Sequence, residues 1–169
     1  MIENVKDIQV EETRAQVACM LNELWHSRLP KIHWSNVVRN THYVCYVFKY
    51  EEAVVGVGIW SSPVARMLNK DTHLELRRLA LCDVCPKNAA TFVLSKMRSL
   101  VKSKFPNIKK LVSYQDTEVH LGTIYKADNW KDMVETSGGE WTSTKRFREN
   151  AQSSAKKIRW EYSICKNDS

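Results

Sequence analysis

The stretch from Ser113 to Trp130, SYQDTEVHLGTIYKADNW, holds within positions 116–125 four side chains that can accept or release protons. These are Asp116, Glu118, His120 and Tyr125. If residues 117–128 form a helix, Asp116 and His120 share one side of it and the other two lie opposite, because residues four apart share a helix face. Asp116 and His120 could then form a carboxylate–imidazole pair for proton transfer or metal ligation. Asp116 could equally be a helix N-cap, which stabilises a helix by about 1 kcal/mol.

The elements around this stretch place it at the edge of a sheet. Residues 108–115 have the pattern of a strand, and ligands of open α/β sheets bind beyond the carboxyl ends of such strands. Alternating apolar residues predict a hairpin over 42–50 and 53–60 and a strand over 73–82. Helical spacing predicts amphipathic helices over 11–27 and 87–105. Their expected buried faces are Val17, Ala18, Leu21, Leu24 and Trp25 in the first, and Phe92, Leu94, Met97, Leu100 and Val101 in the second.

Two more strands are expected, over residues 2–9 and 156–165, with Trp160 of the second in the core. A strand–helix–strand unit over 73–115 needs a crossover, so part of the sheet is parallel, whereas the hairpin is antiparallel. The sequence therefore predicts an α/β fold, a mixed sheet with helices on both faces. Its 169 residues are expected to form a single domain over 1–169.

Composition limits the class of protein. The hydrophobic fraction of 43% suits a globular core. No run of about 18 apolar residues is present and the N-terminus lacks a signal-peptide pattern, so we expect a cytoplasmic protein with no membrane partner. Five cysteines are an odd number in a chain of this length, and reduced thiols are expected. Cys82 and Cys85 form a lone Cys-x-x-Cys, open to structural packing, redox chemistry or a weak zinc site.

The formal charge of +7 is concentrated near the C-terminus. Residues 141–169 hold seven bases and three acids, a net +4. Such a segment favours a polyanionic partner, most often nucleic acid, although a solvated basic tail has the same composition. Trp141, Arg146 and Arg148 combine an aromatic ring with bases, as nucleic-acid-binding segments do.

The start of the 87–105 helix is a candidate phosphate site. Backbone N–H groups and the helix dipole favour an anion at a helix N-terminus, and Lys87 and Asn88 stand there. The segment CPKNAAT has no glycine, so the close backbone approach of a glycine-rich phosphate loop is missing. A plain strand-to-helix turn remains the alternative.

The order of elements resembles the GNAT acyltransferase superfamily. LELRRLALCDVCPKNAATFVLSKM stands where that superfamily binds acyl-CoA pyrophosphate, and GTIYKADNW resembles its Tyr-x-x-x-Gly-Phe helix. Four segments taken together resemble one branch, the Mom family of phage DNA-modification proteins, from about Leu74 to Tyr162. They are LELRRLALCDVCPKN, SYQDTEVHLGTIYKADNW, TSGGEW and AQSSAKKIRWEY.

The resemblance implies an enzyme that adds a carbamoylmethyl group to adenine N6 in phage DNA and so protects it from host restriction. The partner would be double-stranded DNA with the adenine flipped out. It implies acetyl-CoA or another acyl or aminoacyl donor, and iron as a metal, with the donor and any metal left open. A conventional acyl-CoA-dependent N-acetyltransferase and an inactive GNAT-like nucleic-acid-binding module are the alternatives.

The resemblance also extends the list of candidate residues. Tyr125 aligns with the tyrosine that protonates the leaving thiolate in GNAT enzymes, and Ser113, Asp116 and His120 join it as catalytic candidates. His42 and Tyr43 would face the acceptor. Arg77 and Arg78 are adjacent in a strand, so we expect one on each face of the sheet, with one of them holding a phosphate of donor or DNA.

Overall fold

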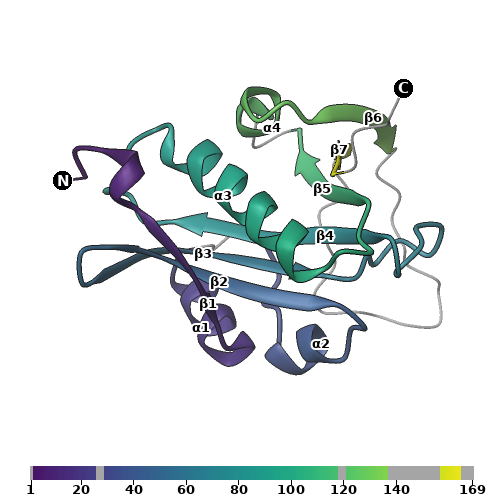
Figure 1. Ribbon diagram of the computed structural model, residues 1–169, viewed down its shortest axis with the longest axis horizontal. Coiled ribbons are helices and arrows are strands. Elements are labelled where there is room, and N and C mark those ends of the chain that lie inside the picture. Colours follow the sequence, from purple (N-terminus) through teal and green to yellow (C-terminus); the bar gives the residue numbers. More distant parts are fainter. Residues whose placement is uncertain (1, 26–28, 118–120, 137–156, 165–169) are drawn as a thin grey trace.

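The computed structural model describes residues 2–25, 29–117, 121–136 and 157–164. Within these residues, seven strands form one sheet in the order β1-β2-β3-β4-β5-β7-β6 (Figure 1). The strands are β1 (Gln9–Thr13), β2 (Tyr43–Tyr50), β3 (Ala53–Ser61), β4 (His73–Leu81), β5 (Lys110–Asp116), β6 (Lys131–Thr136) and β7 (Lys157–Ser163). The helices are η1 (Val5–Asp7, a 3-10 turn), α1 (Ala15–Trp25), α2 (Trp34–Val38), α3 (Ala89–Lys104) and α4 (Thr123–Ala127).

Helices cover both faces of the sheet, as the sequence predicts. Helix α3 lies on one face, and α1 and α2 lie on the other (Figure 1). The face under α3 carries the larger core, which includes Phe48, Trp60, Leu94 and Met97. The smaller core under α1 includes Ala18, Val57 and Ile59. Alternation along β2 and β3 sends successive side chains to these two cores.

The sheet is mixed because of the crossover through α3. Strands β1 to β4 pair antiparallel, β4 and β5 pair parallel, and β7 pairs antiparallel with both β5 and β6. Only Glu51 and Glu52 join β2 to β3, and Glu51 takes a φ of 53° in that turn. The predicted hairpin and the strands in 73–82, 108–115 and 156–165 are all present.

Two expectations for the N-terminal part are wrong, one of them only in part. Residues 2–8 contain a 3-10 turn at Val5–Asp7 in place of a strand, and the first strand, β1, begins at Gln9 and runs into the segment predicted to begin a helix. The buried face of helix α1 was predicted only in part. Ala18 is buried, and Leu21 and Trp25 pack against the same core, as predicted, but Val17 and Leu24 are exposed, Leu24 by 71%. Ala15, Cys19 and Asn22 are buried instead, and these small side chains allow the helix to approach the sheet closely.

In α3, Leu94, Met97 and Val101 are buried as predicted, whereas Leu100 is 39% exposed. Helix α2 and strand β6 were not predicted. Both are short, and neither Trp34–Val38 nor Lys131–Thr136 contains a clear apolar period.

Candidate active site

The sheet divides where β4 and β5 part. Their parallel pairing runs from His73 and Lys110 to Leu76 and Ser113 and then ends, although β4 continues to Leu81 and β5 to Asp116. Beyond Ser113, β5 keeps its pairing with β7 instead. We call this division the β4–β5 fork, and Ser113 lies in its last shared rung.

Two hydroxyl groups meet at the fork. The Ser113 hydroxyl lies 2.8 Å from the Tyr125 hydroxyl, and both side chains are buried. Burial raises the pKa of Tyr125, and the hydrogen bond with Ser113 only partly opposes that shift. The raised pKa keeps the Tyr125 hydroxyl protonated at neutral pH, next to the Ser113 hydroxyl at the fork.

Aromatic neighbours hold the Tyr125 ring in place. Trp160 of β7 stacks on it, with centroids 5.5 Å apart and planes 17° apart. Trp130 meets the ring at 65°, also with a centroid separation of 5.5 Å. The indole N–H of Trp160 donates to Gln115 Oε1 at 2.7 Å, which ties this stack to β5. Trp160 is 2% exposed, so its predicted core position is confirmed.

The backbone around α4 differs from the predicted long helix. Helix α4 covers only Thr123–Ala127, and Asp116 is the last residue of β5. The shared helix face proposed for Asp116 and His120 is therefore wrong, and His120 itself lies outside the described residues. Gly122 is not inside a helix but precedes one, with a left-handed φ of 68°. A Cβ there would collide with Gln115 Oε1 and the Trp160 ring.

The end of α4 has its own left-handed residue. Asn129 has a φ of 61° and occupies the position of the glycine in the Tyr-x-x-x-Gly-Phe pattern. The Trp130 N–H returns to the Tyr125 carbonyl at 2.9 Å, which closes the helix end. Asparagine tolerates this conformation better than most residues, so the sequence ADNW preserves the backbone geometry without glycine.

A buried ion pair fixes α4 against α3. Arg98 of α3 donates to both carboxylate oxygens of Asp128, at 2.6 and 2.7 Å. Asp128 also accepts the Trp130 indole N–H at 2.8 Å. The Arg98 guanidinium lies 4.0 Å from the centroid of the Tyr162 ring of β7. Sequence analysis did not identify this ion pair, because its partners are 30 residues apart.

The face of the sheet opposite α3 carries buried charge beside the fork. Glu75 is buried, accepts the Val64 N–H at 2.9 Å and lies 3.5 Å from Arg77 Nε. Burial raises the pKa of Glu75, and the nearby Arg77 only partly offsets this shift. Glu75 was not among the predicted site residues. Glu75 lies two residues before Arg77, and residues two apart in a strand share a face of the sheet. That spacing could have identified Glu75 as a neighbour of Arg77.

Arg77 and Arg78 do not lie on opposite faces. In the pairing of β3 with β4, Ile59 lies opposite Arg78 and the next residue, Trp60, lies opposite Leu76. Arg77 has no residue of β3 opposite it, so it is the extra residue of a β-bulge. Arg77 donates to Ser61 Oγ at 3.2 Å, and Arg78 donates to the Pro30 carbonyl at 3.0 Å. The bulge thus turns both arginines away from α3, which a regular strand would not allow.

Tyr43 shares that face. It pairs with Ser61, which pairs with Glu75, so these three residues form one row across β2, β3 and β4. The Tyr43 side chain is 39% exposed. His42 lies apart from the row, with Nδ1 3.2 Å from the Lys70 carbonyl oxygen and its ring edge-on to Phe105. The structure therefore brings together Tyr43, Arg77 and Arg78 but not His42.

The β4–α3 connection holds the predicted phosphate residues. Lys87 and Asn88 are exposed, and the Asn88 side chain makes no cap hydrogen bond to the first turn of α3, whose Ala89 N–H donates to the Pro86 carbonyl at 2.9 Å. The Sγ atoms of Cys82 and Cys85 lie 3.7 Å apart, and burial raises the pKa of Cys85 to about 12. The four described cysteines are free thiols, as expected.

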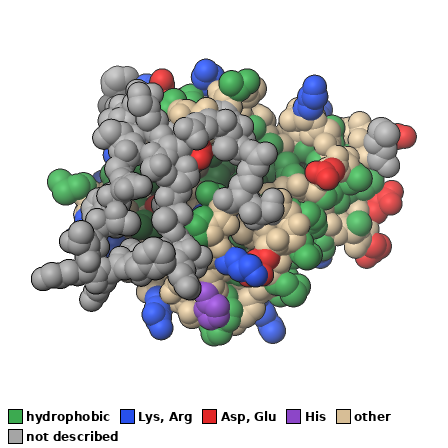
Figure 2. All heavy atoms as spheres, turned by 180° about the vertical axis from the view of Figure 1, so that it is seen from behind, with side chains coloured by type: hydrophobic (Ala, Val, Ile, Leu, Met, Phe, Trp, Pro, Cys, Tyr) green, Lys and Arg blue, Asp and Glu red, His purple; other side chains and the backbone are tan. Residues whose placement is uncertain are grey.

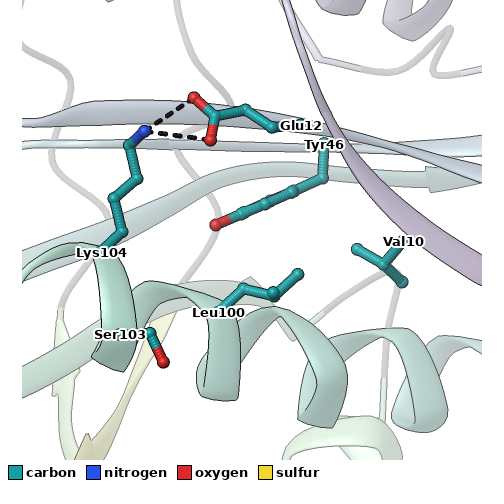
Figure 3. A pocket seen from close by; sticks show the side chains of 6 residues that line it. All are labelled: Val10, Glu12, Tyr46, Leu100, Ser103 and Lys104. Carbon is teal, nitrogen blue, oxygen red and sulfur yellow. Dashed lines mark hydrogen bonds and ion pairs between the residues drawn. The ribbon is translucent and has the colours of Figure 1, made fainter.

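Within the described residues, no three His, Cys, Asp or Glu side chains cluster as metal ligands would, so iron finds no support there. No helix in that part of the chain is long and apolar enough to span a bilayer. A pocket of about 320 Å³ lies between β1, β2 and the end of α3 and holds no predicted site residue (Figure 3). Trp141, Arg146 and Arg148 lie outside the described residues.

Solved structures with the same fold are GNAT acetyltransferases. A GNAT family acetyltransferase from Elizabethkingia anophelis with acetyl-CoA bound is 14% identical, with a TM-score of 0.66 over 94% of this chain and 99% of that one. The ribosomal-protein-S18-alanine N-acetyltransferase of Escherichia coli is 9% identical, with a TM-score of 0.65 over 96% and 98%. The IAA acetyltransferase of Bacillus cereus is 14% identical, with a TM-score of 0.63 over 93% and 99%.

These likenesses establish the GNAT fold for the mixed sheet and its β4–β5 fork. No curated protein matches the chain. The model of the Mom protein family matches residues 9–167, which includes every strand of the sheet and the Ser113–Tyr125 pair. The chain therefore belongs to the Mom protein family.

Proposed function

We propose that this protein transfers a carbamoylmethyl group to adenine N6 in phage DNA, in the cytoplasm of the bacterial host, and thereby protects that DNA from restriction. Membership of the Mom family supports a role in DNA modification. The buried Ser113–Tyr125 hydroxyl pair at the β4–β5 fork is the observation that carries the proposal, since it provides a proton donor where the sheet divides.

The donor is assigned to the fork and the start of α3. Lys87, Asn88 and the start of α3 suit a phosphate-bearing donor. When bound, such a donor would supply a carbamoylmethyl group whose methylene carbon carries the leaving group, because the product is an alkylated amine. N6 would form a bond to the methylene carbon as the bond from that carbon to the leaving group breaks, and N6 would release its proton to solvent. Tyr125, kept protonated by burial, would give a proton to the leaving group and regain one from solvent.

The acceptor is assigned to the opposite face. Tyr43, Arg77 and Arg78 share that face with Glu75, beside the same rungs of β4 that lead to the fork. Arg77 and Arg78 are suited to hold a phosphate near the adenine, since guanidinium groups bind phosphate oxygens through paired N–H donors. Adenine N6 is inaccessible to an enzyme inside a duplex, so the base must be flipped out. Trp141, Arg146 and Arg148 are proposed to act in that step.

A conventional acyl-CoA N-acetyltransferase is the second candidate. The likeness to a GNAT acetyltransferase with acetyl-CoA bound favours it. The glycine-free segment from Cys82 to Asn88 weighs against it, because close approach of backbone N–H groups to a pyrophosphate usually requires glycine.

Mass analysis of nucleosides tests the proposal. DNA from bacteria that express the wild-type chain should contain carbamoylmethyl-adenine, and DNA from cells with Tyr125→Phe should contain far less. Tyr50→Phe, at the far end of β2, is the matched control and should modify DNA like wild type. Unmodified adenine despite soluble wild-type protein would refute DNA modification. Acetylation of a protein or small amine by the purified protein with acetyl-CoA would then support the second candidate.

A further inference from the structure

A second concentration of positive charge lies within the folded part of the chain. The β3–β4 loop with its flanks (residues 62–73) and the segment from the end of α3 into β5 (residues 101–110) hold six bases and one acid. The bases are Arg66, Lys70, Lys102, Lys104, Lys109 and Lys110, and the acid is Asp71. These segments carry a net +5, against +7 for the whole chain. They are distinct from the basic C-terminal segment.

The two segments are held together at one end of the sheet, on the right in Figure 1. The N–H groups of Lys109 and Lys110 donate to the Thr72 carbonyl at 2.8 and 3.1 Å. The His42 ring joins them again, through the Lys70 carbonyl on one side and the Phe105 ring on the other. Charges far apart in the sequence therefore form one surface.

Four of the six bases are available to a partner. Lys104 is held by both carboxylate oxygens of Glu12, as Figure 3 shows, and Lys110 lies 3.5 Å from Glu161. The others are exposed and form no ion pair with any described residue. We call these four the basic end: Arg66, Lys70, Lys102 and Lys109.

Two further observations indicate what the basic end binds. Met67, next to Arg66, is 95% exposed, an unusual position for a large apolar side chain. Acidic side chains gather at the opposite end of the molecule, on the right in Figure 2, where the β2–β3 turn carries Glu51 and Glu52. This separation of charge would orient the molecule with its basic end toward a polyanion. An exposed methionine among bases matches proteins that press apolar side chains against a DNA groove.

We propose that the basic end is a docking surface for the phosphate backbone of duplex DNA, with Met67 as its apolar contact. The choice of duplex DNA as occupant rests on the proposed function. The His73–Lys110 pair of β4 and β5 borders this surface. The last pair before the fork, Leu76 and Ser113, is three residues further along β4. At about 3.3 Å per residue the fork is roughly 10 Å away, so a duplex held here lies next to the proposed acceptor face.

Fluorescence anisotropy with a labelled DNA duplex across a salt series tests the proposal. Each lost phosphate contact lowers the binding constant up to about eightfold at 0.1 M salt and reduces the salt slope by about 0.9. The double variant Lys70→Ala/Lys109→Ala should therefore bind at least about tenfold more weakly at 0.1 M salt, with a slope smaller by about 1.8. Met67→Ser should weaken binding without changing the slope, because it removes an apolar contact only.

The matched control is Lys6→Ala/Lys126→Ala, which removes the same charge from exposed positions in η1 and α4. Equal binding by the two double variants would overturn the proposal. Loss of binding to heparin or anionic vesicles, with binding to the duplex unchanged, would also overturn it by assigning the surface to another polyanion. Failure of this docking proposal can be told apart from failure of the proposed function. If the proposed function is wrong, DNA from cells with the wild-type chain contains unmodified adenine, whatever the variants bind.

Discussion

A double-mutant cycle on Ser113 and Tyr125 separates their contribution to stability from their contribution to chemistry. The two hydroxyl groups are 2.8 Å apart and buried, so each is the other's hydrogen-bond partner. Tyr125→Phe leaves the Ser113 hydroxyl without that partner, and an unsatisfied buried hydroxyl costs about 1 to 3 kcal/mol. The double variant Ser113→Ala/Tyr125→Phe removes both groups, so it should recover most of the lost free energy of unfolding.

Activity should follow a different pattern. A positioned general acid contributes about 10²- to 10⁴-fold to the rate, so every variant that lacks the Tyr125 hydroxyl should lose at least about 100-fold. Urea unfolding measures the free energy, and single-turnover modification of DNA measures the rate. Ser113→Ala alone should retain the proton donor and lose less activity than Tyr125→Phe. Recovery of activity together with stability in the double variant would refute the assignment of Tyr125 as proton donor and leave a packing role.

Three further predictions concern stability and can be checked by urea unfolding. Gly122→Ala should lower the free energy of unfolding by about 1 to 2 kcal/mol or more, because the left-handed φ of 68° strains any residue with a Cβ; an unchanged midpoint would contradict this. Asp128→Ala should lower the free energy of unfolding by about 3 kcal/mol or more, because it leaves the partly buried Arg98 without its carboxylate partner. Asp132→Ala, at an exposed position, is the control and should change the free energy of unfolding by less than about 0.5 kcal/mol. Burial raises the pKa of Tyr125 above its unfolded value of about 10, so the folded state keeps its proton longer and stability should fall as pH rises above about 10. Tyr125→Phe should lose less stability than wild type over that range, and equal losses would argue against the shift.

Much of the sheet could be predicted because its strands show their burial in their own sequence. Strands β2, β3 and β4 lie between two cores and are rich in β-branched, aromatic and aliphatic residues, so their composition indicates that they are strands. The crossover helix α3 has a strong apolar period and a clear end before Pro106.

The details of the site depend on contacts that no local pattern contains. The segment after Asp116 has helical composition, but Gly122 adopts a left-handed conformation under Trp160, which comes 38 positions later in the sequence. The bulge at Arg77 depends on the neighbouring strand, so the shared face of the two arginines could not be inferred from adjacency. Local propensity was overridden by tertiary contacts at these positions.

The position of β7 has a consequence for the order in which the molecule forms. Among the described strands this one comes last in the sequence, yet it lies between β5 and β6 and brings Trp160 onto Tyr125 and Gln115. Pairing between such distant segments is slow, and until it occurs β5 is an unprotected edge that can pair with other chains. Tyr125, the proposed proton donor, would thus be packed only near the end of folding, so nascent or truncated chains without β7 would lack the stack that holds its ring.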